Sequence, residues 1–409
     1  MTKQTNLPDG WQEVELGNKE YFDIISSGIN EFEGEKDYLS TESIQETKIE
    51  KVECKITYEN RPSRANMQPV INSIWFAKMK ATLKVYCFDD NNKNETKKYI
   101  LSTGFCGIKV NEKLVCPQYL RFFLISKDFN EEKDRLSTGS TQMGINNEFI
   151  AKVRLLIPLL ATQKRIVQIL EKAEQAKRKR EEADKLTNNY LKSVFYEMFG
   201  DLNKNNKKFE IKFLEELCPK DKTAIKAGPF GSSLKKSSYS KSGYKIYGQE
   251  QVISGDLNLG DYYISEEKYK ELESYKIRAG DILISLVGTY GKILIVPDKF
   301  HSGIINPRLM KITLDQAKMI PIFFKSLFLS DHILNQLKNV SHGGTMDIIN
   351  VGIIKKIKFP NPPLPLQQKF SKIVEHVEKL KEKQQKSKEK INEMFNVLMQ
   401  RAFKGELIK

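Results

Sequence analysis

Two long stretches of the chain place apolar residues at a helical period and contain neither glycine nor proline. The first follows Pro158 and continues to Gly200, and the second follows Pro365 and continues to Gly405. Proline suits the first turn of a helix, and glycine suits the position just after its end. The pattern predicts two helices of about forty residues, each ~60 Å long at a rise of ~1.5 Å per residue.

Within each stretch, apolar or small residues recur at alternating steps of three and four, which is typical of a helix that pairs with another helix. In the second stretch the expected seam consists of Phe370, Ile373, Val377, Leu380, Gln384, Ser387, Ile391, Met394 and Leu398. In the first stretch it consists of Ile166, Ile169, Ala173, Ala176, Arg180, Ala183, Thr187, Tyr190 and Val194. Both seams are apolar at their ends and polar or small in the middle.

An amphipathic helix of this length leaves a wide apolar stripe in water unless it has a partner. The two helices can pair antiparallel as a coiled coil, with Ile166 close to residues 394–398 and Arg180 facing Gln384 and Ser387. The alternative is that each helix packs only on the domain that precedes it.

The chain also contains an internal repeat with an offset of 204 residues and no gaps. Residues 137–146 (STGSTQMGIN) align with residues 341–350 (SHGGTMDIIN). Further identical pairs are Ile150 and Ile354, Lys152 and Lys356, Pro158 and Pro362, Gln163 and Gln367, Ile169 and Ile373, Glu171 and Glu375, Glu174 and Glu378, and Phe199 and Phe403. A register kept over more than sixty residues predicts two equivalent units related by an approximate two-fold axis.

The helices follow two segments that are too long to be linkers. We expect domains at residues 1–158 and 205–363 and spacer helices at residues 159–204 and 364–409. Short apolar runs at residues 74–76 and 282–287 predict strands, and helices are expected near residues 117–125 and 321–337. The expected fold class is α+β, with two similar α/β-mixed domains separated by the two helices.

The net charge of +15 favours a polyanionic partner, because lysine and arginine release counterions from phosphates. The charge is uneven: residues 1–158 carry −1, residues 159–204 carry +3, residues 205–363 carry +8 and residues 364–409 carry +5. An ordinary basic protein with solvated lysines is the alternative. Charge therefore favours nucleic-acid binding most strongly for the second domain.

Cysteine content and hydropathy narrow the class further. The five cysteines include no C-x-x-C pair, so neither a disulfide framework nor a zinc site is expected. No apolar run approaches the ~18 residues of a membrane-spanning helix, and the amino-terminal residues lack the pattern of a signal peptide. These features lead us to expect an intracellular, cytoplasmic protein.

Several segments together resemble the target recognition domains of type I restriction–modification specificity subunits. In the second domain they are residues 226–234 (KAGPFGSSL), 280–292 (GDILISLVGTYGK), 305–309 (INPRL), 341–345 (SHGGT) and 359–368 (FPNPPLPLQQ). In the first half they are residues 7–11 (LPDGW) and 157–165 (IPLLATQKR). The resemblance covers nearly the whole chain, but residues 36–98 depart from the pattern of the second domain.

The resemblance implies a non-catalytic scaffold on double-stranded DNA. Each recognition domain reads one half of an interrupted DNA sequence, and the paired helices set the distance between the halves. Two methylation subunits dock on the chain, and motor/nuclease subunits join through the complex. S-adenosylmethionine, ATP and Mg are expected on those partner subunits, and no cofactor is expected in this chain.

The sequence does not favour an enzyme. Residues 361–364 (NPPL) resemble an adenine-methyltransferase motif but have leucine where an aromatic residue is needed, and the repeat places them at a hinge. Residues 288–292 (GTYGK) fall short of a phosphate-binding loop and suit a turn. Two other functions remain open: a stand-alone DNA-binding regulator, and a structural adaptor that uses its coiled coil to join proteins.

Candidate DNA contacts are polar residues in loops, since lysine anchors phosphates while glutamine and arginine can read base edges. In the first domain they are Arg61, Arg64, Asn66, Gln68, Ser140, Thr141 and Gln142. In the second they are Lys226, Ser232, Ser233, Lys235, Lys236, Gln249, Arg308, His342 and Thr345. For any one of them, the alternative is a solvated loop residue with no role in recognition.

Overall fold

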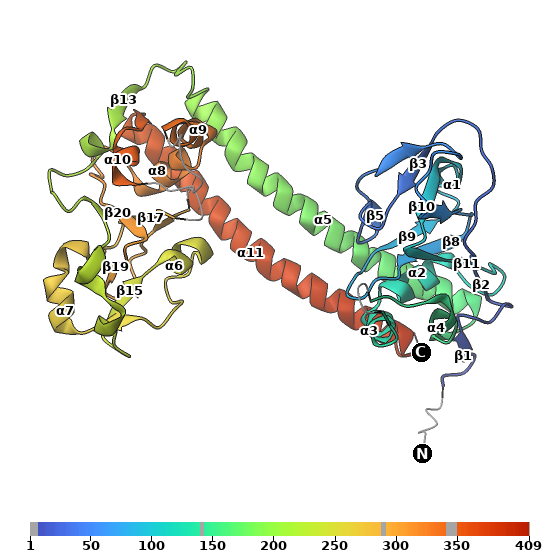
Figure 1. Ribbon diagram of the computed structural model, residues 1–409. Coiled ribbons are helices and arrows are strands. Elements are labelled where there is room, and N and C mark those ends of the chain that lie inside the picture. The colour runs from blue at the N-terminus through green and yellow to red at the C-terminus, as the bar shows by residue number, and fades with distance from the viewer. Residues whose placement is uncertain (1–6, 140–142, 288–291, 341–349, 409) are drawn as a thin grey trace. The chain divides into compact units, whose positions relative to one another are not determined.

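The computed structural model describes residues 7–139, 143–287, 292–340 and 350–408 (Figure 1). The chain divides into two compact units, Met1–Glu182 with Gln384–Lys409 and Ala183–Lys383. Both long helices are continuous: α5 spans Leu160–Phe199 and α11 spans Leu364–Phe403. Each helix therefore contributes residues to both units. The boundaries between the units fall inside the helices and not where the helices meet the domains.

The described part of the first unit contains one mixed sheet and three antiparallel sheets, together with short helices. Its elements are β1 (Gln12–Glu15), β2 (Phe22–Ile24), β3 (Lys36–Leu39), β4 (Ile44–Gln45), β5 (Lys48–Ile49), β6 (Cys54–Ile56), β7 (Ala65–Met67), β8 (Ser73–Ala77), β9 (Val85–Phe88), α1 (Glu95–Lys98), β10 (Tyr99–Ser102), β11 (Phe105–Val110), α2 (Pro117–Ile125), α3 (Lys127–Arg135), α4 (Asn147–Ala151) and β12 (Arg154–Ile157). The sheets have the orders β6-β3-β10-β7, β2-β11-β8-β9, β1-β12 and β4-β5. Every residue of β8 is buried, as expected for an apolar run flanked by turns.

The second unit has a related plan. Its elements are β13 (Glu210–Phe213), η1 (Leu214–Leu217), β14 (Ile225–Ala227), η2 (Gly231–Leu234), η3 (Lys236–Ser238), β15 (Tyr244–Tyr247), α6 (Gln249–Ser254), β16 (Tyr263–Ile264), α7 (Glu266–Glu271), η4 (Glu273–Tyr275), β17 (Ile282–Ser285), β18 (Ile293–Ile295), β19 (Gly303–Ile305), β20 (Leu309–Ile312), α8 (Pro321–Phe328), α9 (Asp331–Val340), α10 (Val351–Lys355) and β21 (Lys358–Asn361). The sheets have the orders β14-β20-β17-β18, β16-β15-β19 and β13-β21. The prediction of two mixed α/β domains is confirmed.

The repeat predicted from the sequence is confirmed element by element. The helices α2, α3, α4 and α5 and the strand β12 each begin 204 residues before α8, α9, α10, α11 and β21. Asn146 and Asn350 cap α4 and α10 in the same way, each accepting a hydrogen bond from the amide three residues later. The structural repeat thus begins at Pro117 and Pro321, about twenty residues before it becomes visible in the sequence.

The two helices run antiparallel within each unit. In the first unit the start of α5, with Ile166 and Leu170, shares a core with Met399 and Phe403 at the end of α11. In the second unit the ring centroid of Phe199, at the end of α5, lies 5.3 Å from that of Phe370, near the start of α11. Each helix therefore begins against the domain that precedes it and ends against the other domain.

The predicted seam is buried or partly buried at most of its positions, and three of its members are exposed. Leu380, Met394 and Tyr190 are exposed by 46%, 48% and 53%, although the sequence placed them in the seam. The predicted Ile169, Ala176, Ala183, Ile373 and Ser387 are partly buried. The rows in which every residue is buried or partly buried are Ile166, Leu170, Ala173, Lys177, Arg180, Asp184, Thr187, Leu191, Val194 and Met198 in α5, and Phe370, Val374, Val377, Lys381, Gln384, Lys388, Ile391, Phe395, Leu398 and Ala402 in α11. The two rows keep the 204-residue offset, and in both copies they differ from the predicted seam by one residue at the second heptad position only.

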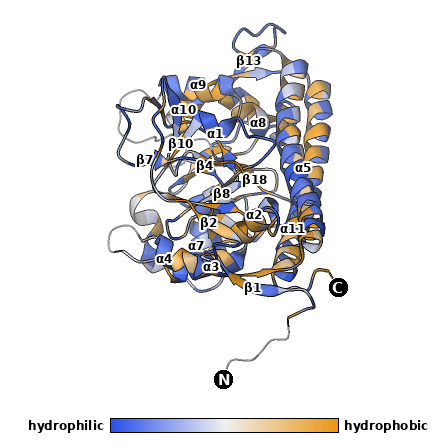
Figure 2. Cartoon of the chain, turned by 90° about the vertical axis from the view of Figure 1, so that its right-hand side faces the viewer, coloured by the Kyte–Doolittle hydropathy of each residue, from blue (hydrophilic) through white to orange (hydrophobic). Residues whose placement is uncertain are grey.

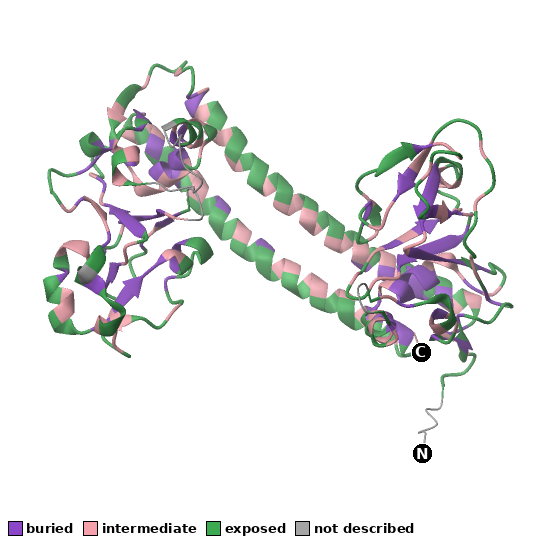
Figure 3. Ribbon diagram, viewed as in Figure 1, coloured by how far each residue is buried: buried purple, intermediate pink, exposed green. Residues whose placement is uncertain are grey.

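Apolar and buried residues are unevenly distributed along the two long helices. Apolar and polar residues alternate on α5 and α11 (Figure 2), and fully buried residues gather toward the helix ends (Figure 3). Between Ala173 and Phe199 no residue of α5 is fully buried. The terminal segments therefore supply most of the apolar burial of each helix.

Both helices end where the sequence predicts. Gly200 and Gly405 have φ of +72° and +75°, the left-handed conformation that glycine adopts at little cost. At the end of α11 the amide of Glu406 donates to the carbonyl oxygen of Arg401 over 2.8 Å, which satisfies one of the last helical carbonyls. Among the described residues, no helix has the length and apolar content needed to span a membrane.

A buried glutamine fixes the start of each helix. Gln163 accepts from the amide of Cys116 (2.8 Å) and donates to the carbonyl oxygens of Leu114 (2.8 Å) and Pro158 (2.9 Å). Gln367, its repeat equivalent, accepts from the amide of Ile320 and donates to the carbonyls of Lys318 and Pro362. Both side chains are fully buried. The same three bonds thus join helix, hinge and preceding domain in both copies.

We expect Gln163→Met and Gln367→Met each to lower the free energy of unfolding by about 1–3 kcal/mol, because each leaves buried backbone groups without a partner. Chemical denaturation measures the change. Gln168→Met and Gln368→Met, at exposed positions of the same helices, are the matched controls and should cost little. Equal stability of the buried and exposed variants would contradict the assigned role.

Candidate nucleic-acid interface

In the second unit, three segments that the sequence singled out meet beside β14, β20 and β17. The amide of Gly228 donates to the carbonyl oxygen of Leu309 over 2.9 Å, and the amide of Leu286 donates to the carbonyl oxygen of Arg308 over 2.9 Å. A Cβ atom on Gly228 would lie 2.0 Å from the carbonyl oxygen of Asn306, so only glycine allows this approach. The side chain of Arg308 is exposed here.

Gln249 lies at the same edge, and its side-chain amide already donates hydrogen bonds within the protein. It begins α6, and its amide nitrogen donates to Ser285 Oγ over 2.7 Å and to the carbonyl oxygen of Val287. These bonds fix its side chain at the end of β17, adjacent to the Arg308 turn. Its position suits a contact with DNA, while its amide hydrogens are already used within the protein.

The lysines of this region differ in whether their ammonium groups are bonded within the unit or exposed to solvent. The ammonium of Lys226 donates to Ser274 Oγ over 2.6 Å and lies 4.2 Å from the centroid of the Tyr275 ring, so it is held within the unit. Lys235 and Lys236 are exposed, as is Ser233. For Ser232 only the backbone is described, and His342 and Thr345 lie outside the described residues.

In the first unit the predicted polar cluster lies before, within and directly after β7. Arg61 stacks over Tyr58, with its guanidinium carbon 4.2 Å from the ring centroid, and also donates to the carbonyl oxygen of Tyr58. Gln68 donates to the carbonyl oxygen of Thr96 over 3.2 Å. Asn66 is half-buried in β7, and the Arg64 side chain is exposed. Arg64 is therefore the member of this cluster most open to a phosphate.

The candidates Ser140, Thr141 and Gln142 lie outside the described residues, and the backbone that follows them is bonded to the rest of the unit. The amide of Lys80 donates to the carbonyl oxygen of Met143, and the amide of Ile145 donates to that of Lys78, over 2.9 and 3.0 Å. These bonds attach the segment after residue 142 to the connection between β8 and β9.

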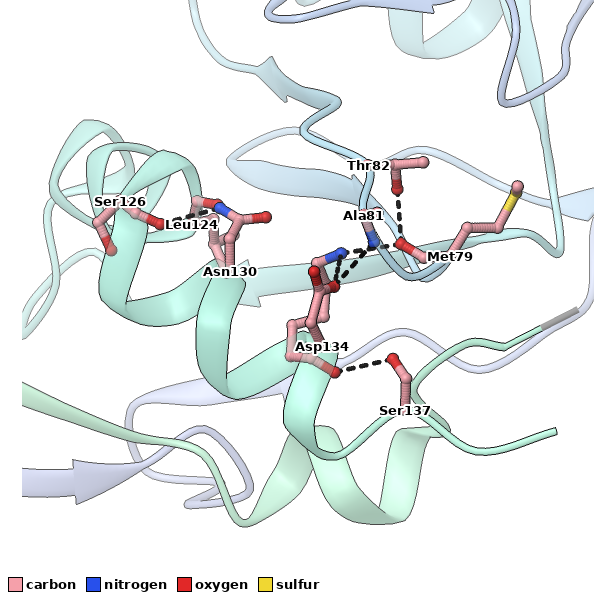
Figure 4. Close-up of polar contacts among 9 residues, drawn as sticks. Met79, Ala81, Thr82, Leu124, Ser126, Asn130, Asp134 and Ser137 are labelled. Atoms are coloured by element: carbon pink, nitrogen blue, oxygen red, sulfur yellow. Dashed lines mark hydrogen bonds and ion pairs between the residues drawn. The ribbon is translucent and has the colours of Figure 1, made fainter.

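A buried lysine and the neighbouring aspartate hold that connection in place, and Figure 4 shows Asp134 beside Met79 and Ala81. Lys133 of α3 is 1% exposed, and its ammonium donates to the carbonyl oxygen of Met79 over 2.8 Å and pairs with Asp134 over 3.0 Å. Asp134 also accepts from the amide of Ala81, and Ser137 Oγ donates to the carbonyl oxygen of Lys133. The repeat equivalent of Lys133 is the buried Leu337, so this network belongs to the first unit.

We expect Lys133→Leu to lower the free energy of unfolding by about 1–3 kcal/mol, because Met79 and Asp134 lose a buried partner. Hydrogen exchange should become faster at the amides of Lys80 and Ile145. Lys127→Leu, on the same helix but with a side chain 84% exposed, is the control. Unchanged exchange in Lys133→Leu would show that the lysine does not hold this loop.

Three of the five cysteines, Cys87, Cys106 and Cys218, are buried. Burial raises the pKa of the Cys87, Cys106 and Cys218 thiols to about 12, which keeps them protonated and unreactive at neutral pH. All five cysteines are free thiols. Within the part of the chain that the structure describes, no group of three or more histidine, cysteine or acidic residues is placed to hold a metal ion.

Of the two enzyme-like motifs, the NPPL segment has a structural role. Asn361 is the last residue of β21, paired with Glu210, and its Oδ1 accepts from Gln367 over 3.2 Å, so the NPPL segment is a hinge. Residues 288–291 lie outside the described residues, and the strands on either side, β17 and β18, form an antiparallel pair. Asp281, just before β17, has its pKa raised by burial and accepts from Thr313 Oγ1 over 2.6 Å.

A family comparison covers most of the chain and matches it twice. The family described as type I restriction modification DNA specificity domain matches residues 8–187 and again residues 206–393. The chain belongs to this family and carries two copies of its domain. Specificity subunits are the non-catalytic subunits of type I restriction–modification systems, in agreement with the sequence prediction.

Individual relatives agree with this assignment. The chain is 22% identical over 418 residues to the type I restriction enzyme MjaVIII specificity subunit of Methanocaldococcus jannaschii, covering 98% of this chain and 94% of that protein. It is 25% identical over 337 residues to the EcoKI specificity subunit of Escherichia coli strain K12, covering 74% and 68%. A chain from a structure on complex assembly and conformational transition of the type I R-M system shares the fold, with a TM-score of 0.64, 20% identity and coverage of 98% and 99%.

Proposed function

We propose that the chain is the DNA sequence-specificity subunit of a type I restriction–modification complex and reads a bipartite, interrupted target in double-stranded DNA. The observation that carries the proposal is a repeated frame with unlike reading loops. The helices and the hinge glutamines correspond at a fixed offset of 204 residues, whereas the polar loops of the two domains differ. Such a molecule offers two different reading surfaces on equivalent supports.

The proposed partners are two methylation subunits and, through the complex, motor/nuclease subunits. Tyr190 and Met394 support a docking role for the helices, since they are repeat equivalents and both are about half exposed. S-adenosylmethionine, ATP and Mg belong to the partner subunits in this proposal, and the chain itself holds no cofactor. The complex works on cytoplasmic DNA, and the length of the paired helices sets the gap between the two half-sequences.

The function is tested with the chain alone and with added methylation subunits. Labelled S-adenosylmethionine should transfer methyl groups to DNA only when methylation subunits are present, at a divided target that methylation mapping identifies. Methyl transfer by the chain alone would refute the non-catalytic assignment. An undivided target would refute the bipartite one, and a reconstituted complex that methylates irrespective of sequence would refute specificity.

The exposed lysines after β14 should bind phosphates of the DNA backbone. We expect Lys235→Ala with Lys236→Ala to weaken DNA binding by the complex and to reduce the slope of log K against log salt by up to ~2, because each phosphate that a lysine no longer neutralises keeps about one counterion. Lys220→Ala with Lys222→Ala makes the same charge change before β14 and should have a smaller effect. Equal slopes for both double variants would mean that only net charge matters.

The exposed row on the helices should bind the methylation subunits. We expect Tyr190→Ser and Met394→Ser each to weaken the assembly by about 1–2 kcal/mol, because each removes an apolar interface side chain. Titration calorimetry or sedimentation measures the affinity. Tyr196→Ser, with a 64% exposed ring on another face of α5, is the control. If Tyr196→Ser weakens assembly while the other two do not, the docking face has been misassigned.

A further inference from the structure

Phe230 is a large apolar side chain that the second unit presents to solvent. It is 66% exposed, compared with 54% for Tyr262 and 44% for Phe213 in the same unit. The next residue, Gly231, has φ of +63°, and a Cβ atom there would meet nothing within 4 Å. The ring is therefore carried at a turn that faces open space.

The backbone on both sides of Phe230 is anchored. Gly228 and Pro229 are buried before it, and Gly228 is bonded to Leu309. After it, Leu234 is 8% exposed and packs in a cluster with Ile246 and Ile264. Exposing a phenylalanine forgoes about 1.5–3 kcal/mol of burial, so a fixed loop that presents one is suited to covering the ring with a partner.

The surroundings of Phe230 are cationic. Lys235 and Lys236 follow it and are exposed, and the exposed Arg308 lies in the turn that contacts the base of the loop. Residues 205–363 carry a net charge of +8. An apolar ring beside such charges fits a polyanion that also offers apolar surfaces. Double-stranded DNA is such a polyanion, because its bases are stacked between two phosphate backbones.

We propose that Phe230 is a DNA-contacting residue that inserts its ring at a base step of the half-sequence read by the second domain. The inference rests on the proposed function. Lys235 and Lys236 contact the phosphates beside that step, and Arg308 lies at the same edge of the domain. An inserted apolar side chain partly unstacks the bases, which adds contact energy that depends little on salt.

The test uses the full chain in complex with methylation subunits, on duplexes that contain the mapped target. We expect Phe230→Ala to weaken specific binding roughly tenfold, as removal of an aromatic ring from a stacked base does, with the salt slope unchanged. Phe230→Trp should retain the affinity. Phe213→Ala, which removes an exposed ring of the same type from β13, is the control and should bind as the wild type does.

A second measurement needs no variant of the loop. Duplexes carrying 2-aminopurine at successive positions of the second half-sequence should show increased fluorescence at one step when the wild-type complex binds, since the probe brightens when unstacked. The increase should be absent in Phe230→Ala at saturating protein. Wild-type binding with no bright position anywhere in that half-sequence would overturn the insertion, even if the variant failed to fold.

The outcomes separate this inference from the proposed function. If the wild-type complex shows no sequence-specific binding, the proposed function fails. If it binds specifically and Phe230→Ala binds equally well, only the role of Phe230 is refuted. If Phe230→Ala loses affinity for the methylation subunits but not for DNA, the ring is a protein-docking residue and the proposal is wrong.

Discussion

The structure depends on how the apolar ends of two forty-residue helices are buried. Ile166 and Leu170 at the start of α5 pack with the end of α11, and Phe199 at the end of α5 packs with Phe370. A helix of this length with one apolar stripe is not stable in water without such partners. Because each core takes the start of one helix and the end of the other, neither domain completes its core without both helices.

The residues that hold the domains on the helices are different from the loop residues that we propose contact DNA. Gln163 and Gln367 make the same hydrogen bonds in the two copies. The connection between domain and helix therefore has the same structure in both copies. The two copies differ beside the loops: the buried Lys133 of the first unit bonds to the carbonyl oxygen of Met79, and its repeat equivalent in the second unit is the buried Leu337. Changes in a loop can therefore alter a reading surface while the hinge bonds and the helix ends keep their geometry.

The sequence predicted the long helices, their ends, the repeat and the hinge, because glycine, proline and the 204-residue offset are local signals. It misplaced three members of the seam, since Tyr190, Leu380 and Met394 are exposed. Periodicity alone does not distinguish an apolar row that faces a helix from one that faces solvent. Lys133 and Phe230 were missed for a related reason: burial of a lysine and exposure of a phenylalanine depend on tertiary contacts that composition does not show.

Polar residues in the middle of the seam constrain the register in which the two helices pair. Gln384 is 9% exposed, and Lys177, Arg180, Lys381 and Lys388 are half-buried at heptad positions where apolar residues would be more stabilising. Polar residues at such positions lower stability, but they fix the register, because a shifted pairing leaves them without suitable neighbours. If the paired helices set the gap between two half-sequences, as proposed above, a unique register matters more than the strongest possible pairing. The apolar ends then provide stability, and the polar middle is suited to fixing the length.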